Sequence, residues 1–367
     1  MLRPNFWRHF DFWLLGAVII ALVFGVTMIR SAVAGNENLA SLVPRQIIFG
    51  AIGFVVIILA AMIDYRFWSG AIVPMYIVIV FFLLLLFSIG AAHFGATRWI
   101  ETGLVSIQPT ELAKMVVILA LANFFDRNIT TNRSWGWLVK SLIIAIGIAG
   151  LIFIQPNLSN VIVIMVLWAA MAWVAGLQLK QLGILILVVG VLGVVAFSFF
   201  LQPYQRLRIT QFIFPPENAS YGSTYNVLQA LAALGSGGWV GKGYGHGTQT
   251  QLRFMKVRHN DFIFSVIGEE LGLIGAIFVL ALIGFIIYRC LRAARLARDP
   301  FGSMISYGVA ILIFFQAVVN IAVNLNLIPV TGIPLPFISY GGSGLISLML
   351  GIGLVESVVL RHKPLDY

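Results

Sequence analysis

Hydrophobic residues occur along the chain in long uncharged runs that short polar segments separate. Because a membrane-spanning helix needs about 20 apolar residues, the runs predict about ten transmembrane helices, at residues 12–30, 46–63, 68–92, 109–125, 138–154, 160–175, 182–201, 262–288, 304–325 and 338–360. The pattern therefore predicts an all-α, polytopic integral membrane protein. The runs at 109–125, 138–154 and 160–175 are short or interrupted, and irregular backbone at membrane depth needs protein or water around it. We expect these three runs to line a cavity.

Composition supports the membrane assignment. Hydrophobic residues make up 60% of the chain and charged residues only 10%, whereas soluble domains carry about 25% charged residues. Soluble enzymes, disordered proteins and secreted disulfide scaffolds are excluded. The single cysteine, Cys290, cannot form an internal disulfide and excludes a cysteine-rich metal site.

The net charge of +10 comes from basic residues at the ends of the runs, where lipid and topology explain it, and we expect no nucleic-acid partner. With the N-terminus inside, the cytoplasmic segments contain most of these residues: Arg3, Arg8, Arg66, Arg127, Arg133, Lys140, Lys180, Arg289, Arg292, Arg295, Arg298, Arg361 and Lys363. The short outer loops hold only Arg30, Arg45 and Arg98. This bias places both termini in the cytoplasm. It also leaves residues 202–260 as one long outer loop between the seventh and eighth helices of a single domain, 1–367.

Glu111 and Lys114 lie three residues apart at the start of the fourth run, behind Pro109. On a helix this spacing places both side chains on one face, where they can pair. One interpretation is a structural ion pair between helices. The other is a charge pair that lines a polar cavity, with Lys114 available to an anionic ligand.

Asp261 lies where the long outer loop ends and the eighth run begins. A carboxylate at a helix N-terminus is most often a simple N-cap. At the outer mouth of a cavity it could equally serve as a general base or as a ligand for a cation. Spacing alone favours the cap.

The outer loops contain two segments with unusual backbone. Seven of the thirteen residues from Gly235 to Gly247 are glycine. The Gly241-Lys242 pair does not fit a phosphate loop, because Ser236 replaces its first glycine and Gly243 its hydroxyl residue. The glycine run either approaches a sugar or pyrophosphate closely or forms a re-entrant turn. Residues 324–343 hold three prolines and a Gly-Gly-Ser sequence, which predicts rigid, non-helical backbone.

Nine ordered motifs resemble the family of shape, elongation, division and sporulation (SEDS) proteins, and its RodA branch more than its FtsW branch. The resemblance covers nearly the whole chain and includes Gln108-Pro109-x-Glu111-x-x-Lys114 and Asp261-Phe262-Ile263-Phe264. The motifs lie at 95–100, 108–114, 155–158, 204–206, 235–238, 241–243, 247–249, 261–264 and 329–343. In two places the chain departs from the family pattern: Asn157 replaces an aspartate, and Met255-Lys256-Val257 replaces Leu-Pro-Glu.

The resemblance implies a peptidoglycan glycosyltransferase that polymerises lipid II on the outer face of the bacterial cytoplasmic membrane. It also implies a class B penicillin-binding protein, a transpeptidase, as partner. The family residue matched by Asp261 is required for polymerisation, so Asp261 becomes the candidate base, with binding of a divalent cation (Mg or Mn) as an alternative role. Candidates to stabilise the leaving pyrophosphate are, in order of preference, Lys114, Arg206, Arg98 and Lys242, and Glu111 would hold Lys114 in place.

Two other functions remain open from the residues. A lipid II flippase would also need interrupted helices and a charged pair inside the membrane. A scaffold that positions the transpeptidase is the weaker alternative, because a scaffold does not require charge within the membrane. The clustering of unusual polar residues on one side of the membrane favours an enzyme over a transporter.

Overall fold

The structure is a computed structural model that describes residues 9–362 apart from 90, 94–95, 102–105, 131–132, 200, 216–221, 253 and 256–257. For residues 38, 87–89, 91–93, 96–101, 106–107, 192, 194–198 and 223 it describes the backbone alone.

Long helices overlap every predicted run, which confirms the polytopic membrane fold. They are α1 (Phe12–Val33), α2 (Leu42–Met62), α3 (Tyr65–Ile89), α4 (Pro109–Arg127), α5 (Trp135–Ile154), α6 (Leu158–Val174), α7 (Leu179–Phe199), α11 (Ile263–Leu296), α12 (Pro300–Asn324) and α13 (Gly342–Leu360). Seven of them, α1, α2, α3, α5, α11, α12 and α13, are long and apolar enough to cross a membrane. Helices α6 and α7 contribute shorter apolar stretches, and α4 carries charged residues at both of its ends.

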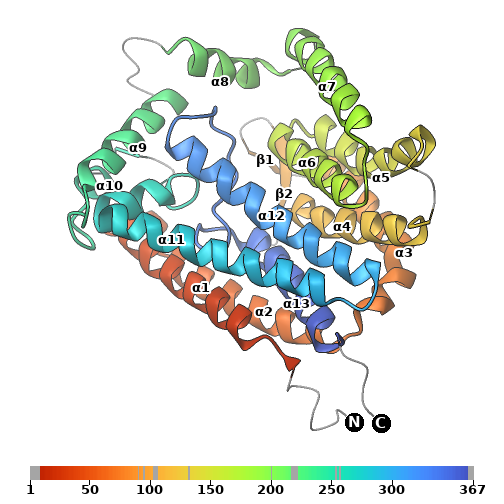
Figure 1. The fold of residues 1–367 in the computed structure, drawn as a ribbon. Helices are drawn as coiled ribbons and strands as arrows, with labels where there is room; N and C mark the ends of the chain where they lie inside the picture. The colour runs from red at the N-terminus through yellow and green to blue at the C-terminus, as the bar shows by residue number, and fades with distance from the viewer. Residues whose placement is uncertain are drawn as a thin grey trace.

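The bundle is built around α13, which is almost wholly buried. Helix α13 packs against α2, α11 packs between α1 and α12, and α4 packs against α3 and α12 (Figure 1). On the outer helices, many large apolar side chains are exposed, as expected for surfaces that face lipid. Helix α4 is buried along nearly its whole length despite its charges. It therefore places Glu111 and Lys114 inside the protein and away from lipid.

The two described ends of the chain meet. The His9 and His362 rings lie 5.1 Å apart between centroids, and the Glu356 carboxylate accepts a hydrogen bond from the backbone N–H of Asp11. Arg289, near the far end of α11, pairs with Asp11 at 2.5 Å. The start of α1, the end of α13 and the end of α11 therefore share one side of the bundle (Figure 1). This arrangement agrees with an even number of spans.

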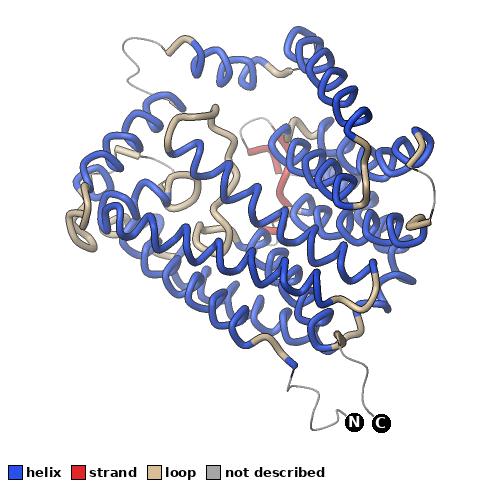
Figure 2. Tube along the Cα trace, viewed as in Figure 1, coloured by secondary structure: helices blue, strands red, loops and turns tan. Residues whose placement is uncertain are grey.

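The opposite side carries the shorter elements. Residues 202–260, predicted as an outer loop, contain α8 (Pro203–Ile213), α9 (Ser223–Gly237) and α10 (Thr248–Gln251), and a 3₁₀ turn, η2 (Glu37–Leu39), follows α1. Three short antiparallel strands pair in the order β1 (Ala91–His93), β2 (Ala96–Glu101) and β3 (Ser106–Ile107) (Figure 2). No strand is predicted from the sequence. The segment between α3 and α4 lacks an apolar run of spanning length, and strand pairing satisfies part of its backbone.

Helix α11 is interrupted at Gly272, whose φ of 66° and ψ of −159° are not helical. The backbone of residues 238–243, here called the glycine-rich turn, fills the interruption. Lys242 and Gly243 donate to the carbonyls of residues 269 and 270, and residues 273 and 274 donate to the carbonyls of Gly238 and Trp239. A Cβ on Gly272 would lie 2.4 Å from the Gly241 nitrogen. The glycines therefore serve a re-entrant turn that packs on α11, the second of the two interpretations above.

Candidate functional site

The charged pair of α4 faces a cavity. Pro109 begins the helix, and Glu111 and Lys114 follow on one face. Their oxygen and nitrogen lie 2.8 Å apart with both side chains buried, which confirms the pairing predicted from their spacing. Lys114 also contacts the Asn160 amide oxygen on α6 at 3.4 Å. The ammonium is thus held between two helices and still borders open space.

This space, here called the polar cavity, has a volume of about 470 Å³. Helices α4, α6, α8 and α12 and the two irregular segments before α11 and α13 enclose it. Polar side chains form much of its wall: Gln108, Glu111, Lys114, Asn157, Ser159, Asn160, Arg208, His259, Asn260, Gln316, Thr331, Tyr340 and Ser343. Two of the three short predicted runs, 109–125 and 160–175, thus contribute to the cavity wall, whereas the run at 138–154 contributes no residue to it. The non-helical segment at 324–343 supplies a large part of the wall.

A second cavity of about 500 Å³, here called the apolar cavity, adjoins the first. Its wall is mostly aliphatic and aromatic, with Ile162, Ile209, Phe315, Val318 and Ile328 among its members. The two cavities share Asn157, Ser159, Arg208, Thr331 and Ile333. A molecule with a polar head and a long apolar chain could therefore occupy both, with its junction beside Arg208.

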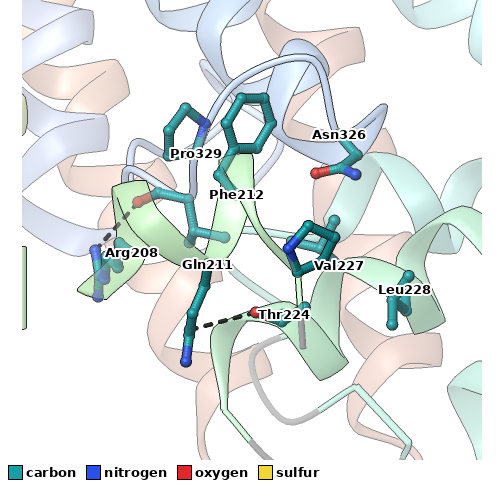
Figure 3. A pocket seen from close by; sticks show the side chains of 10 residues that line it. Arg208, Gln211, Phe212, Thr224, Val227, Leu228, Asn326 and Pro329 are labelled. Atoms are coloured by element: carbon teal, nitrogen blue, oxygen red, sulfur yellow. Dashed lines mark hydrogen bonds between the residues drawn. The ribbon is translucent and has the colours of Figure 1, made fainter. Parts of the chain in front are cut away.

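Arg208 of α8 sits where the cavities meet. Its guanidinium donates to the Val330 carbonyl at 3.2 Å and lies over the Tyr204 ring, 5.8 Å from the centroid. The same side chain lines a small outer pocket of about 90 Å³ between α8 and α9, where Gln211 accepts from Thr224 (Figure 3). These contacts hold a cation at the boundary between polar and apolar space.

Asp261 is not itself in the wall of the polar cavity but directly follows two residues that are, His259 and Asn260. A Cβ on the lining residue Gly332 would come within 3.9 Å of its Oδ2 atom. Asp261 does not cap α11, because Phe262 occupies the N-cap position and Asp261 Oδ1 has no hydrogen-bond partner. The simple capping interpretation is therefore wrong. The residue is half-buried, and its carboxylate lies beside the lining residue Gly332.

The backbone around Asp261 is held rigidly by α12. The amides of Asn320 and Asn324 both donate to the Asp261 carbonyl, at 3.1 and 2.9 Å. The Asn324 oxygen in turn accepts from the backbone and the hydroxyl of Ser265 in α11. Ser339 donates to the carbonyl of Asn260 at 2.7 Å. The carboxylate is thus positioned by buried asparagines on a rigid helix.

Unpaired polar atoms gather around this cavity. Among the described residues, six side chains here each have a buried atom without a hydrogen-bond partner: Asn157, His259, Asn260, Asp261, Gln316 and Thr331. Leaving one such atom unsatisfied costs about 1–3 kcal/mol, so native proteins rarely cluster them without a reason. Water or the polar part of a molecule in the cavity would supply the missing partners.

The electrostatics suit proton transfer near neutral pH. Burial raises the pKa of Asp261 to about 6, and the positive charge of Arg208 opposes part of that rise. Burial lowers the pKa of His259 to about 4, with Arg258 acting in the same direction. At neutral pH the aspartate is therefore ionised and the neighbouring histidine is neutral. Groups of three or more His, Cys, Asp or Glu side chains that could hold a metal do not occur among the described residues.

Of the other predicted cations, Arg206 and Lys242 are not in the wall of the polar cavity. Arg206 lies two residues from Arg208 on α8 and is absent from the cavity wall, because two residues on a helix point in nearly opposite directions. Lys242 pairs with the buried Glu269 at 3.1 Å and fastens the glycine-rich turn to α11. Arg98 belongs to β2, and its side chain lies outside the described residues.

The sequence analysis did not single out Arg208, Gln316, Asn320 or Asn324. A signal was present for the last three, which recur every four residues within an apolar helix and so share one face. Arg208 follows Tyr204 by four residues and shares its face of α8. Only the tertiary structure distinguishes it from Arg206.

Comparisons with known proteins agree with the motifs. The cell cycle protein family of FtsW, RodA and SpoVE matches residues 5–363. The peptidoglycan glycosyltransferase MrdB of Escherichia coli K12 is 34% identical over 99% of this chain and 98% of its own length. The probable peptidoglycan glycosyltransferase FtsW of Hydrogenovibrio crunogenus is 33% identical over 96% of this chain and 92% of its own length.

Solved structures show the same fold. A chain from a peptidoglycan synthase complex that coordinates polymerization and crosslinking superposes with a TM-score of 0.83, at 28% identity over 97% of this chain and 99% of that chain. The rod shape determining protein RodA of Thermus thermophilus superposes with a TM-score of 0.72, at 28% identity over 98% of both chains. The chain therefore belongs to the FtsW, RodA and SpoVE family of cell cycle proteins, the SEDS family that its motifs resemble.

Proposed function

We propose that this chain is a peptidoglycan glycosyltransferase that polymerises lipid II, for cell elongation and shape, and that the polar cavity is its reaction site. The observation that carries the proposal is the polar cavity, with the Glu111–Lys114 pair in its wall, beside an apolar cavity of similar size. Lipid II has a sugar head, a pyrophosphate and a polyprenyl chain, and this pair of cavities matches that order. The names of the glycosyltransferase relatives support the same activity.

In the proposed reaction, an acceptor sugar hydroxyl attacks the anomeric carbon of a lipid-linked donor. A new carbon–oxygen bond forms, the bond from the anomeric carbon to the phosphate oxygen breaks, and the configuration inverts. Asp261 takes the hydroxyl proton, for which a pKa of about 6 is well matched to neutral pH. The lipid pyrophosphate leaves with the bonding electron pair and gains negative charge.

Two cations are placed to stabilise that charge. Lys114 borders the polar cavity, and Glu111 holds its ammonium. Arg208 lies at the junction with the apolar cavity, and a guanidinium can bind a phosphate with two parallel hydrogen bonds. Fixed charges of this kind act before the reaction begins, so they cost no reorganisation when the bond breaks.

The alternative role proposed for Asp261, in place of the base, is to bind a divalent cation, Mg or Mn. Mg²⁺ is usually held by one or two carboxylates together with substrate phosphates. Asp261 supplies one carboxylate, and the unpaired Asn260 amide oxygen lies next to it in the chain. These two donors fit an ion that is also bound by substrate phosphates better than an ion that protein atoms surround completely. Such an ion would neutralise charge on the pyrophosphate. Asp261 and Asn260 would hold it.

We further propose that residues 1–367 act as one transmembrane domain in the bacterial cytoplasmic membrane, with both termini in the cytoplasm and the polar cavity facing outward. The basic residues at the ends of the runs support this orientation. The proposed partner is a class B penicillin-binding protein. The solved relative from a complex that coordinates polymerization and crosslinking supports that pairing.

The test replaces the carboxylate. Purified Asp261→Asn, combined with the transpeptidase partner, should extend lipid II into glycan at least about 100-fold more slowly than the natural chain, because the base is lost. The matched control is Glu37→Gln, which removes an exposed outer carboxylate and should leave the rate unchanged. Glycan length is followed on gels with labelled lipid II, and thermal unfolding verifies that both variants fold.

Translocation of labelled lipid II across liposomes is measured on the same preparations. Normal polymerisation by Asp261→Asn would refute the assignment of the base. If the natural chain translocated lipid II without polymerising it, the chain would be a flippase.

A further inference from the structure

The glycine-rich turn presents two large apolar side chains to its surroundings. Trp239 is 74% exposed and Val240 is 71% exposed. Keeping apolar surface in water costs about 25 cal/mol per Å², so a pair of this size at the tip of a turn is costly unless something covers it. Within the turn, residues 238–243, the one charged side chain is Lys242, which pairs with Glu269 at 3.1 Å. The tip itself is therefore apolar.

The turn is fixed at a definite level of α11. The backbone N–H groups of Leu273 and Ile274 donate to the carbonyls of Gly238 and Trp239, at 2.9 and 3.2 Å. Leu273 is 43% exposed and Ile274 is 59% exposed. The exposed tip of the turn is thus continuous with the exposed, lipid-facing surface of the helix.

The length of that surface matches a bilayer. The exposed large apolar residues of α11 continue from Ile274 through Ile277, Phe278, Leu280 and Phe285 to Tyr288, and the next exposed charge is Arg292. From Ile274 to Arg292 a helix rises about 27 Å, close to the roughly 30 Å of a hydrocarbon core. Trp239 at one end and Tyr288 near the other occupy the levels at which interfacial aromatic residues gather.

We propose that Trp239 and Val240 insert at the boundary between head groups and acyl chains in the outer leaflet, and that this turn anchors the protein at a fixed height in the membrane. Indole rings favour that boundary because one edge can remain hydrated while the ring meets the acyl chains. The α11 segment between the N-cap and Gly272, about 14 Å long, then lies outside the hydrocarbon. Asp261, at its start, then stands on the outer, aqueous side of that boundary.

The depth of the turn can be measured directly. Cys290 is fully buried, so the natural chain serves as the unlabelled blank. Trp239→Cys carries an environment-sensitive nitrobenzoxadiazole probe in phosphatidylglycerol and phosphatidylethanolamine vesicles, and Val240→Cys repeats the measurement at a second site. Both probes should be quenched several-fold more strongly by lipids with a spin label near the head group than by aqueous iodide or by lipids labelled near the end of the chain.

Two controls bracket the expected depth. Ile277→Cys, on the exposed face of α11, should respond most to the deep spin label, and Glu37→Cys, in the outer 3₁₀ turn, should respond most to iodide. If the probes at 239 and 240 followed the Glu37→Cys control, the anchor would be refuted. If they followed the Ile277→Cys control, the turn would lie within the hydrocarbon and the proposed level would be wrong.

Discussion

At the scale of residues, the pKa of Asp261 defines the pH dependence of the proposed base. Because burial raises that pKa to about 6, the carboxylate fraction, and with it polymerisation, should increase as pH rises through about 6. His259 has a pKa of about 4 and stays neutral over this range. Between these two neighbouring groups, the acid limb is therefore assigned to Asp261.

Arg208→Gln should shift the pH at which polymerisation is half-maximal. The positive charge of Arg208 lowers the pKa of Asp261. Without that charge the pKa increases further, and the midpoint of the acid limb shifts to higher pH. Polymerisation rates from pH 5 to pH 8 test this, with the limb's midpoint as the readout because Arg208→Gln also weakens pyrophosphate binding. Lys140→Gln removes an equal charge from an exposed site on α5 and should leave the midpoint in place. An unmoved limb in Arg208→Gln would contradict the coupling.

The Glu111–Lys114 pair can be separated into structural and chemical roles. Lys114→Met leaves a buried carboxylate without its cation, which should destabilise the fold by about 3–5 kcal/mol. The double variant Glu111→Gln, Lys114→Met removes both charges and should recover most of that loss. We expect the double variant to fold and to remain inactive. Thermal unfolding in detergent measures its stability. Full polymerisation by the double variant would show that the pair is structural only.

At the scale of elements, the interruption of α11 determines where its outer segment lies. Gly272 adopts a backbone conformation essentially restricted to glycine, and the glycine-rich turn supplies the hydrogen bonds that the interruption would otherwise lack. Glu269 reinforces the junction by accepting from the backbone of Gln249 and Thr250. The helix segment that follows Asp261 is thus fixed by a loop distant in sequence.

Gly272→Ala should destabilise the protein. The backbone strain alone costs about 1–3 kcal/mol, and the new methyl group would meet the Gly241 nitrogen at 2.4 Å. Gly284→Ala, in the same helix, meets nothing within 4 Å and should have little effect. Thermal unfolding in detergent compares the two, and equal midpoints would contradict the proposed role of the turn.

At the scale of the whole molecule, the bundle separates two environments. The start of α1 and the end of α13 meet on one side, while α8 and α9 lie toward the other (Figure 1). An enzyme that acts on a lipid-linked sugar needs this asymmetry, because the sugar head must reach water while its chain stays in lipid.

Cysteine labelling in intact cells tests the proposed orientation of the chain in the membrane. Glu37→Cys should react with a membrane-impermeant maleimide before permeabilisation, and Arg292→Cys, exposed at the far end of α11, only afterwards. The natural chain, whose single cysteine is buried, should remain unlabelled in both conditions. The reverse order of labelling would invert the proposed topology and place the cavity in the cytoplasm.

The sequence by itself determined the helices and the chemistry available to them. Hydrophobic runs are set by local composition, so every predicted span overlaps a helix, and the three-residue spacing of Glu111 and Lys114 was enough to predict their pairing. Only the tertiary structure chose between Arg206 and Arg208, assigned Lys242 to Glu269, and showed that Asp261 is not a cap. Those outcomes depend on contacts between segments far apart in the chain, which periodicity within one segment cannot reveal.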